Sequence, residues 1–294
     1  MSSSAQRRGF LAGTAAYFIW GLFPLYWNLF RTLPTFGLLA HRIVWCAVAV
    51  WAWLLVKGEG DWWRRIPRAT ILRLALSSVL ISANWAVYIA AVNNGHVIDT
   101  SLGYFITPLA NVLFGVAVLR ERLNALQWLA VACAAAGVLY LVVVIGSIPG
   151  IALFLALSFG GYGLVRKLTP VDAVHGLALE SSLLFIPSVV WLLWSTPQDG
   201  GFLQLSWFLE AMLVVGGAVT AVPLVLFAVA ARNVPLTWLG FLQYIAPTVG
   251  LLLGVFVFHE PFGAERWIAF GLIWLALGIF SADALRRYWR SAAI

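Results

Sequence analysis

Three ionisable residues lie well inside long apolar runs of the sequence, away from their ends, where a charge is costly. His41 and Arg42 fall in the run from Phe36 to Val56, and Glu180 falls in the run from Val174 to Trp194. A charged side chain at the centre of a membrane span costs at least about 2.5 kcal/mol, so it faces the bundle interior and finds a partner. One interpretation is structural: an ion pair, for Glu180 with Arg42 or His41 as its neighbour, or a side chain that snorkels towards the interface. The functional one is that Arg42 or His41 binds substrate charge or closes a gate, and that Glu180 exchanges protons.

Polar and aromatic side chains recur at helical spacing within the other apolar runs. Asn84 and Tyr88 are four residues apart with Trp85 beside them, and Tyr104 and Asn111 are seven apart, which places each set on one helical face. Converging amides, phenols and indoles suit an amphipathic organic molecule better than a bare ion, although interhelical hydrogen bonding is the alternative. The candidate substrate-binding residues are Trp20, His41, Arg42, Asn84, Trp85, Tyr88, Tyr104, Asn111, Gln243 and Tyr244. Six of them are expected to line one central space: Trp20, Tyr88, Tyr104, Asn111, Gln243 and Tyr244.

Two prolines lie in the middle of apolar runs. Pro108 and Pro247 each lack the backbone N–H that an uninterrupted helix uses, and proline is a frequent cause of helix kinks. We predict that both are hinge or kink elements rather than ligands.

Patterns typical of enzymes and metal sites are missing from the sequence. The four histidines, at positions 41, 96, 175 and 259, are scattered, and no HExxH, paired-aspartate or phosphate-binding glycine motif occurs. Cys46 and Cys133 both fall within apolar runs and are interpreted as packing residues. We therefore expect no catalytic residues, no metal and no cofactor, and the absence of a nucleotide-binding motif excludes direct coupling to ATP.

The composition indicates an integral membrane protein. Of the 294 residues, 63% are hydrophobic and only 10% are charged, which is too little charge for a water-soluble surface. The net charge of +7 does not indicate a nucleic-acid partner, because the basic residues stand between apolar runs instead of forming one stripe. The expected surroundings are a lipid bilayer.

The apolar runs are long enough to cross a bilayer, which takes roughly 20 residues each. Continuous runs, rather than short alternating segments, favour helices over a β-barrel. We predict ten spans: Gly9 to Phe30, Phe36 to Val56, Ile71 to Val92, Ile98 to Leu119, Ala125 to Val144, Ile151 to Leu168, Val174 to Trp194, Trp207 to Ala231, Leu236 to Phe258 and Ala264 to Ala284.

The two halves of the chain are related by an internal repeat with a displacement of 139 positions. The displacement aligns residues of unlike type without a gap, which generic hydrophobicity cannot do. It pairs Ile106 with Ile245, Pro108 with Pro247, Gly115 with Gly254, Glu121 with Glu260, Trp128 with Trp267, Gly21 with Gly160, Gly37 with Gly176 and His41 with Glu180. The predicted units are residues 1–145 and 146–294, each with five spans, in one membrane domain.

The distribution of basic residues predicts the topology. Most of the 18 lysines and arginines fall on one side if both termini are cytoplasmic, in agreement with the positive-inside rule. Because each unit has an odd number of spans, the second must enter the membrane in the opposite orientation. The expected fold is an all-α bundle of ten transmembrane helices in two inverted repeats, an architecture that suits alternating access to a site near the midplane.

Several of these segments together resemble the RarD family, within the EamA group of the drug/metabolite transporter superfamily. They are WGLFPLYW from Trp20, AHR from Ala40, AVNNGH from Ala91, SLGYFI from Ser101, LRERL from Leu119 and GFLQYIAPT from Gly240. The resemblance runs from about Gly9 to Ala284. It implies a permease of the bacterial inner membrane that acts as an exporter, in a family linked by name to chloramphenicol sensitivity. It does not identify a substrate.

The sequence as a whole predicts a secondary transporter that moves a small amphipathic organic molecule outward, coupled to protons through Glu180. Inverted repeats also occur in channels, so a membrane channel or a non-transporting receptor stays open as the alternative. The oligomeric state does not follow from the sequence.

Overall fold

The protein is all-helical in the computed structural model, which describes residues 3–30, 33–93, 97–145, 150–196, 201–202, 205–257 and 264–292. Short 3₁₀ turns occur at Asn28–Phe30 and Trp62–Arg65. The helices are α1 (Ser3–Trp27), α2 (Thr35–Val56), α3 (Arg68–Asn93), α4 (Val97–Ala117), α5 (Ala125–Ile145), α6 (Gly150–Leu168), α7 (Ala173–Trp194), α8 (Trp207–Asn233), α9 (Leu236–Gln243), α10 (Ile245–Phe256) and α11 (Ala264–Ala292).

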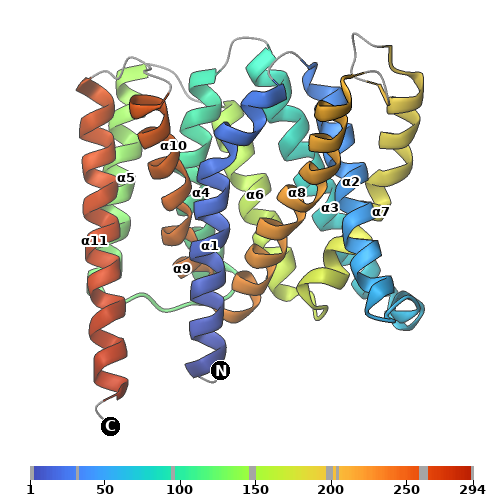
Figure 1. Ribbon diagram of the computed structural model, residues 1–294. Helices are drawn as coiled ribbons and strands as arrows, with labels where there is room; N and C mark the ends of the chain where they lie inside the picture. The colour runs from blue at the N-terminus through green and yellow to red at the C-terminus, as the bar shows by residue number, and fades with distance from the viewer. Residues whose placement is uncertain are drawn as a thin grey trace.

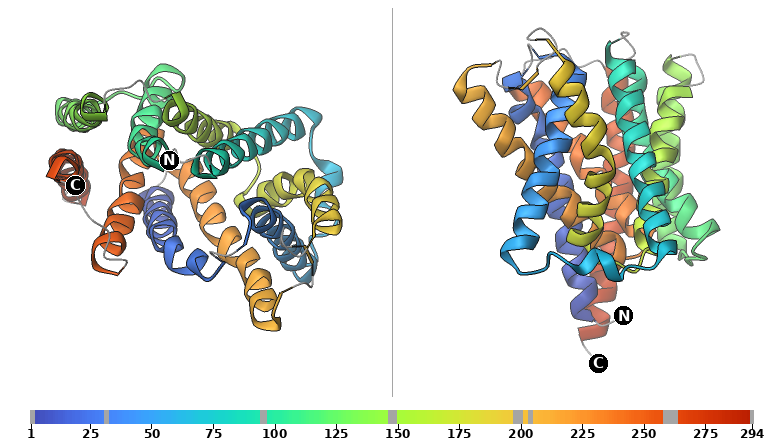
Figure 2. Two further views of the ribbon diagram at one scale, coloured as in Figure 1. Left: turned by 90° about the horizontal axis from the view of Figure 1, so that it is seen from above. Right: turned by 90° about the vertical axis from the view of Figure 1, so that its right-hand side faces the viewer.

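The helices form one bundle in which α1 begins and α11 ends at the same end (Figure 1). We call this the terminal end. The connections from α2 to α3, α4 to α5, α6 to α7 and α8 to α9 also lie there, and α5 and α11 stand together at one side (Figures 1 and 2). Lys57, Arg64, Arg120 and Lys167 occupy these connections or the adjoining helix ends, so basic residues concentrate at the terminal end.

The outer surface of the bundle is apolar, as a bilayer requires. Leu72, Leu139, Val143, Ile186 and Leu193 are each at least 62% exposed, and a water-soluble protein rarely presents so many large apolar side chains together. Within the described residues, seven helices are long and apolar enough to cross a membrane: Ser4–Phe30, Phe36–Val56, Arg68–Tyr88, Ala125–Val144, Gly150–Leu168, Ala173–Trp194 and Trp207–Asn233. The apolar parts of α4 and α11, Gly103–Ala117 and Gly271–Asp283, are shorter.

The predicted span from Leu236 to Phe258 is interrupted, because its helix breaks between α9 and α10 at Tyr244. Pro247 explains the break. It has no N–H to donate to the carbonyl of Gln243, and its ring crowds that carbonyl. Pro108, by contrast, lies inside α4, which continues on both sides of it.

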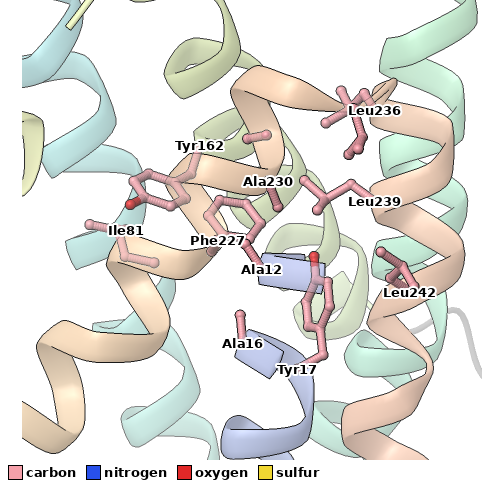
Figure 3. Packing of buried hydrophobic residues seen from close by; sticks show 12 residues of the cluster. Ala12, Ala16, Tyr17, Ile81, Tyr162, Phe227, Ala230, Leu236, Leu239 and Leu242 are labelled. Carbon is pink, nitrogen blue, oxygen red and sulfur yellow. The ribbon is translucent and has the colours of Figure 1, made fainter. Parts of the chain in front are cut away.

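The interior contains aromatic side chains packed among small ones. Figure 3 shows one cluster where α1, α6, α8 and α9 meet, with Tyr17, Tyr162 and Phe227 at its centre. The rings of Tyr162 and Phe227 are stacked, with centroids 5.6 Å apart. Small residues allow the helices to approach: a Cβ added to Gly240 would lie 2.6 Å from the backbone oxygen of Pro108, so α9 crosses directly over α4.

Glu121 holds the start of α9 in place. Its carboxylate accepts hydrogen bonds from the backbone N–H of Leu236 at 2.6 Å, and from the N–H and hydroxyl of Thr237 at 2.9 and 2.7 Å. These groups include the free donors of the first helical turn. Glu121, which belongs to the first half of the chain, therefore caps a helix of the second half. Its repeat partner Glu260 lies outside the described residues, as do His96 and His259.

Candidate functional site

A cavity of about 30 Å³ lies inside the bundle. Helices α2, α3, α6, α7 and α8 contribute its walls, and the lining includes Arg42, Trp85 and Glu180 among the residues expected to bind substrate or protons. The other lining residues are Ile43, Cys46, Ile81, Tyr162, Leu177, Ser181, Leu184, Thr220 and Leu224. The volume is enough for only one or two water molecules, so a larger molecule enters only when helices move apart.

Arg42 lines this cavity, and aromatic rings surround its guanidinium. The carbon at the centre of its guanidinium lies 4.5 Å from the ring centroid of Trp27, 5.1 Å from that of Trp85 and 5.8 Å from that of Phe23. These are cation–π distances. The Nε atom donates to the hydroxyl of Thr220 at 3.3 Å.

The guanidinium of Arg42 has donors to spare. Arginine carries five N–H groups, and the hydrogen bond to Thr220 uses one of them. Among the residues that the structure describes, no carboxylate forms an ion pair with Arg42. The rings of Tyr88 and Tyr104 contact each other, with centroids 5.9 Å apart.

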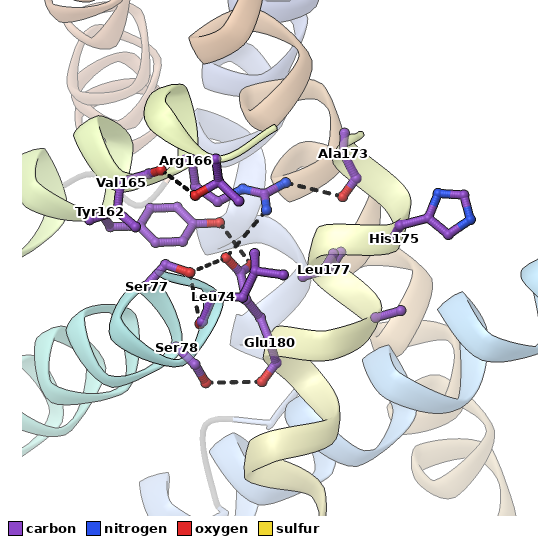
Figure 4. Close-up of polar contacts among 12 residues, drawn as sticks. Leu74, Ser77, Ser78, Tyr162, Val165, Arg166, Ala173, His175, Leu177 and Glu180 are labelled. Atoms are coloured by element: carbon purple, nitrogen blue, oxygen red, sulfur yellow. Dashed lines mark hydrogen bonds and ion pairs between the residues drawn. The ribbon is translucent and has the colours of Figure 1, made fainter. Parts of the chain in front are cut away.

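Glu180, which also lines the cavity, is the centre of a buried polar cluster (Figure 4). The expectation of Arg42 or His41 as its neighbour is wrong, because the partner is Arg166 of α6. The Nη1 atom of Arg166 lies 3.5 Å from Oε1 of Glu180, and the two side chains are 0% and 4% exposed. Ser77 donates a hydrogen bond to Oε1, and the Tyr162 hydroxyl makes a long contact of 3.5 Å with Oε2.

The backbone around this cluster fixes the position of Arg166. Its Nη2 atom donates to the carbonyl of Ala173 at 3.3 Å, and Ser78 donates to the carbonyl of Glu180 at 3.0 Å. Gly176 makes the room, because a Cβ at that position would lie 1.9 Å from Nη1 of Arg166. Helices α3, α6 and α7 are thereby joined around one ion pair.

Arg166 is absent from the candidate residues, because its place in the last turn of α6 marks it in the sequence as a topology-setting charge. One signal points to it. Tyr162 and Arg166 are four residues apart, so they share a helical face. An arginine one turn from a tyrosine at the end of a span is compatible with an inward-facing polar stripe.

The remaining candidates make contacts between helices away from the lining of this cavity. Asn84 donates to the carbonyl of Leu155 and the hydroxyl of Ser158, at 2.8 and 2.9 Å. Asn111 donates to the side-chain oxygen of Gln243 at 2.8 Å, joining α4 to α9.

Three further candidates are packed against neighbouring groups. The Tyr244 hydroxyl donates to the carbonyl of Phe105 at 3.3 Å. His41 is fully buried, with its ring 5.2 Å from that of Phe202. Trp20 packs in the aromatic cluster, with its ring centroid 5.4 Å from that of Tyr17. Of the candidate residues that the structure describes, Arg42, Trp85 and Glu180 line the cavity, whereas Tyr88 and Tyr104 are not among its lining residues.

Comparison with known proteins identifies the family. The pattern of the EamA-like transporter family matches residues 7–143. A protein named RarD from Streptomyces exfoliatus is 43% identical, over 99% of this chain and 94% of its own length, and RarD of Escherichia coli K12 is 40% identical over 97% of each chain. The chain belongs to the RarD family of EamA-like transporters.

Other RarD relatives carry general names. An uncharacterized transporter of Pseudomonas aeruginosa is 45% identical over 99% of this chain and 97% of its own. A solved crystal structure superposes on this RarD-family chain with a TM-score of 0.71 at 21% identity, covering 95% of this chain and 98% of the other. That likeness shows the fold alone. Together with the apolar helices, these relatives make the protein a multi-pass membrane transporter.

Proposed function

We propose that the protein is a secondary transporter that moves a small amphipathic organic molecule by alternating access, with the cavity between Arg42 and Glu180 as its substrate site. The proposal rests on one observation, the combination of polar and aromatic groups in the cavity wall. A guanidinium with free donors, an indole and a carboxylate line one space inside a membrane bundle, and ligand sites place a few such polar groups in an apolar wall.

Helix packing supports an inverted repeat within this transporter. The 139-residue displacement relates α1 to α6, α2 to α7, α3 to α8, α4 to α9 and α10, and α5 to α11. Packing between the halves follows this correspondence. Helix α1 packs on α8, and their counterparts α6 and α3 also pack on each other. Helix α4 packs on α6, and their counterparts α10 and α1 do the same. Corresponding helices also pack on one another, in the pairs α2 with α7, α4 with α9, and α5 with α11.

The residues around the cavity support a pseudo-twofold axis through it. Three pairs of lining residues are each separated by the repeat displacement: Arg42 with Ser181, Ile81 with Thr220, and Trp85 with Leu224. Tyr244 donates its hydrogen bond to its own repeat partner, Phe105. Equivalent positions meet at one centre only if an axis passes near it, and transporters with inverted repeats bind substrate at such an axis.

The arrangement of the charges supports ten crossings with both termini in the cytoplasm, in the inner membrane of a bacterium. The connections at the terminal end carry Lys57, Arg64 and Arg120, as the positive-inside rule requires of a cytoplasmic face. Within this topology, α4, the α9–α10 pair and α11 supply the remaining three crossings.

Glu180 and Arg42 stand near opposite ends of the cavity. Glu180 follows the start of α7 by seven residues and Arg42 follows the start of α2 by seven, so each lies roughly 10 Å from its own end of the bundle. In this proposal, the Glu180 cluster forms the closure on the cytoplasmic side. Proton uptake by Glu180 requires its ion pair with Arg166 to open, which couples protonation to opening of that side. Outward transport is the part of the proposal that comes from the family resemblance.

The proposal is tested by screening metabolites and antibiotics for thermal stabilisation of the purified protein, then measuring flux of the compounds that bind in proteoliposomes. A carrier gives uptake that saturates and that accelerates when unlabelled compound is present on the opposite side. Liposomes containing heat-inactivated protein are the control. Uptake that rises linearly with concentration, without acceleration, would indicate a channel, and binding with no flux would indicate a receptor.

A further inference from the structure

We propose that the substrate class of this site is an organic anion: a carboxylate that pairs with Arg42, attached to an aromatic or flat apolar body that lies against Trp27 and Trp85. This inference deepens the proposed function and rests on it. It concerns which molecules the site accepts, and nothing in the family names specifies this.

The net charge of the site favours an anionic ligand. The acidic and basic side chains around the cavity are Arg42, Glu180 and, behind Glu180, Arg166. Glu180 and Arg166 are paired at 3.5 Å with almost no exposure, so they neutralise each other. The positive charge of Arg42 remains. A charge inside a membrane bundle is costly without a partner, and a bound anion supplies the partner that the described protein residues do not.

The geometry of the Arg42 donors suits a carboxylate. The Nε edge of Arg42 is directed to Thr220, and the rings of Phe23, Trp27 and Trp85 lie near the guanidinium carbon. The terminal nitrogens stay available for a ligand. A planar guanidinium offers parallel N–H groups that match the two oxygens of a carboxylate.

The aromatic surroundings of Arg42 favour a ligand with a ring or a flat apolar body. Trp85 lines the cavity, and the ring centroid of Trp27 lies 4.5 Å from the guanidinium carbon, so indole rings flank the position of a ligand beside Arg42. Offset or edge-to-face contacts with such rings favour an aromatic ligand. A small inorganic anion would satisfy the charge and leave these apolar faces uncovered.

A set of matched probes separates charge from shape. Phenylacetate and 3-phenylpropionate carry both the ring and the charge, their amides carry the ring alone, and acetate carries the charge alone. Calorimetric titration of the purified protein is expected to show binding of at least one arylcarboxylate, with its amide and acetate each at least tenfold weaker. Equal binding of acid and amide, or binding of neither arylcarboxylate, overturns the inference.

Variants locate the binding at Arg42. Arg42→Gln is expected to weaken arylcarboxylate binding at least tenfold, and Arg42→Lys, which keeps the charge but not the planar donors, is expected to fall between Gln and wild type. Arg64→Gln removes a positive charge from an exposed turn and is the matched control with unchanged binding. Circular dichroism and size-exclusion profiles confirm that each variant is folded. Wild-type affinity in folded Arg42→Gln refutes the assignment.

The same probes distinguish the two levels of the proposal. Arg42-dependent binding of an arylcarboxylate without saturable flux would leave the anion site standing and remove the transport function. Saturable, trans-accelerated flux of neutral or cationic compounds that is unaffected by Arg42→Gln would leave transport standing and remove the anion inference.

Discussion

Removal of the carboxylate from the buried ion pair gives the sharpest prediction for stability. The Arg166 side chain is fully buried and that of Glu180 is 4% exposed, so Glu180→Gln leaves a guanidinium in the bundle interior without its counter-charge. Losing one partner of a buried pair typically costs about 3–5 kcal/mol. We expect Glu180→Gln to lower the free energy of unfolding by an amount of that order.

The partner substitutions turn this into a double-mutant cycle. Arg166→Gln alone leaves a buried carboxylate and is also expected to destabilise, whereas the Glu180→Gln, Arg166→Gln double variant leaves no buried charge. The double variant should recover part of the loss, with a coupling energy of about 0.5–3 kcal/mol. The exposed pair of Arg64 and Asp61, 3.7 Å apart and more than two-thirds exposed, is the matched control, and its cycle should give less than about 1 kcal/mol because solvent screens it.

The assay is reversible unfolding in mixed micelles of increasing denaturing detergent, followed by circular dichroism. Coupling between Glu180 and Arg166 that is no larger than that of the exposed control would refute the reasoning, because it would mean that the pair is not desolvated as the structure has it.

Three further predictions follow from the same contacts. Gly176→Ala should displace the Arg166 guanidinium and lower the free energy of unfolding by about 1–3 kcal/mol. Gly250→Ala, where the added methyl group meets open space, is the control and should not lower it. Equal effects of the two substitutions would contradict the packing around Arg166. Glu121→Gln should lose about 1–3 kcal/mol of stability in the same assay, because an amide group replaces an acceptor of charge-assisted bonds at the start of α9, and an unchanged midpoint would exclude this capping role. Glu180→Gln protein that is reconstituted in folded form should still exchange substrate but fail to accumulate it under an imposed pH difference, and accumulation at the wild-type rate would remove Glu180 from coupling.

The class of protein and the interior polar residues could be predicted from the sequence, because both follow from the cost of placing charge in a bilayer. Arg42 and Glu180 stand out for that reason alone, and both line the cavity. The kink near Pro247 was also predictable from the missing N–H of proline.

The partners of these residues could not be predicted in the same way. Glu180 pairs with Arg166 rather than Arg42 because the rotation of each helix about its own axis decides which side chains meet. In a span that is apolar on nearly all sides, the sequence pattern contains little information about that rotation. The same holds for Asn84, whose amide is satisfied by α6 and is therefore engaged in helix packing.

Alternating access at the cavity is the central claim, and cysteine labelling from the two sides tests it most directly. Ser181 lines the cavity, and among the described residues its hydroxyl donates only to carbonyls of its own helix, so Ser181→Cys is a mild change. The background carries Cys46→Ala and Cys133→Ala, which remove the two native thiols, and serves as the unlabelled control.

Oriented membrane vesicles allow a membrane-impermeant thiol reagent to be applied to either face, with and without a bound arylcarboxylate. We predict that the thiol introduced by Ser181→Cys reacts from both faces. The ligand should change the labelling rates from the two faces in opposite directions, because opening one side closes the other. Labelling from both faces that rises or falls together, or labelling from one face under every condition, would contradict alternating access.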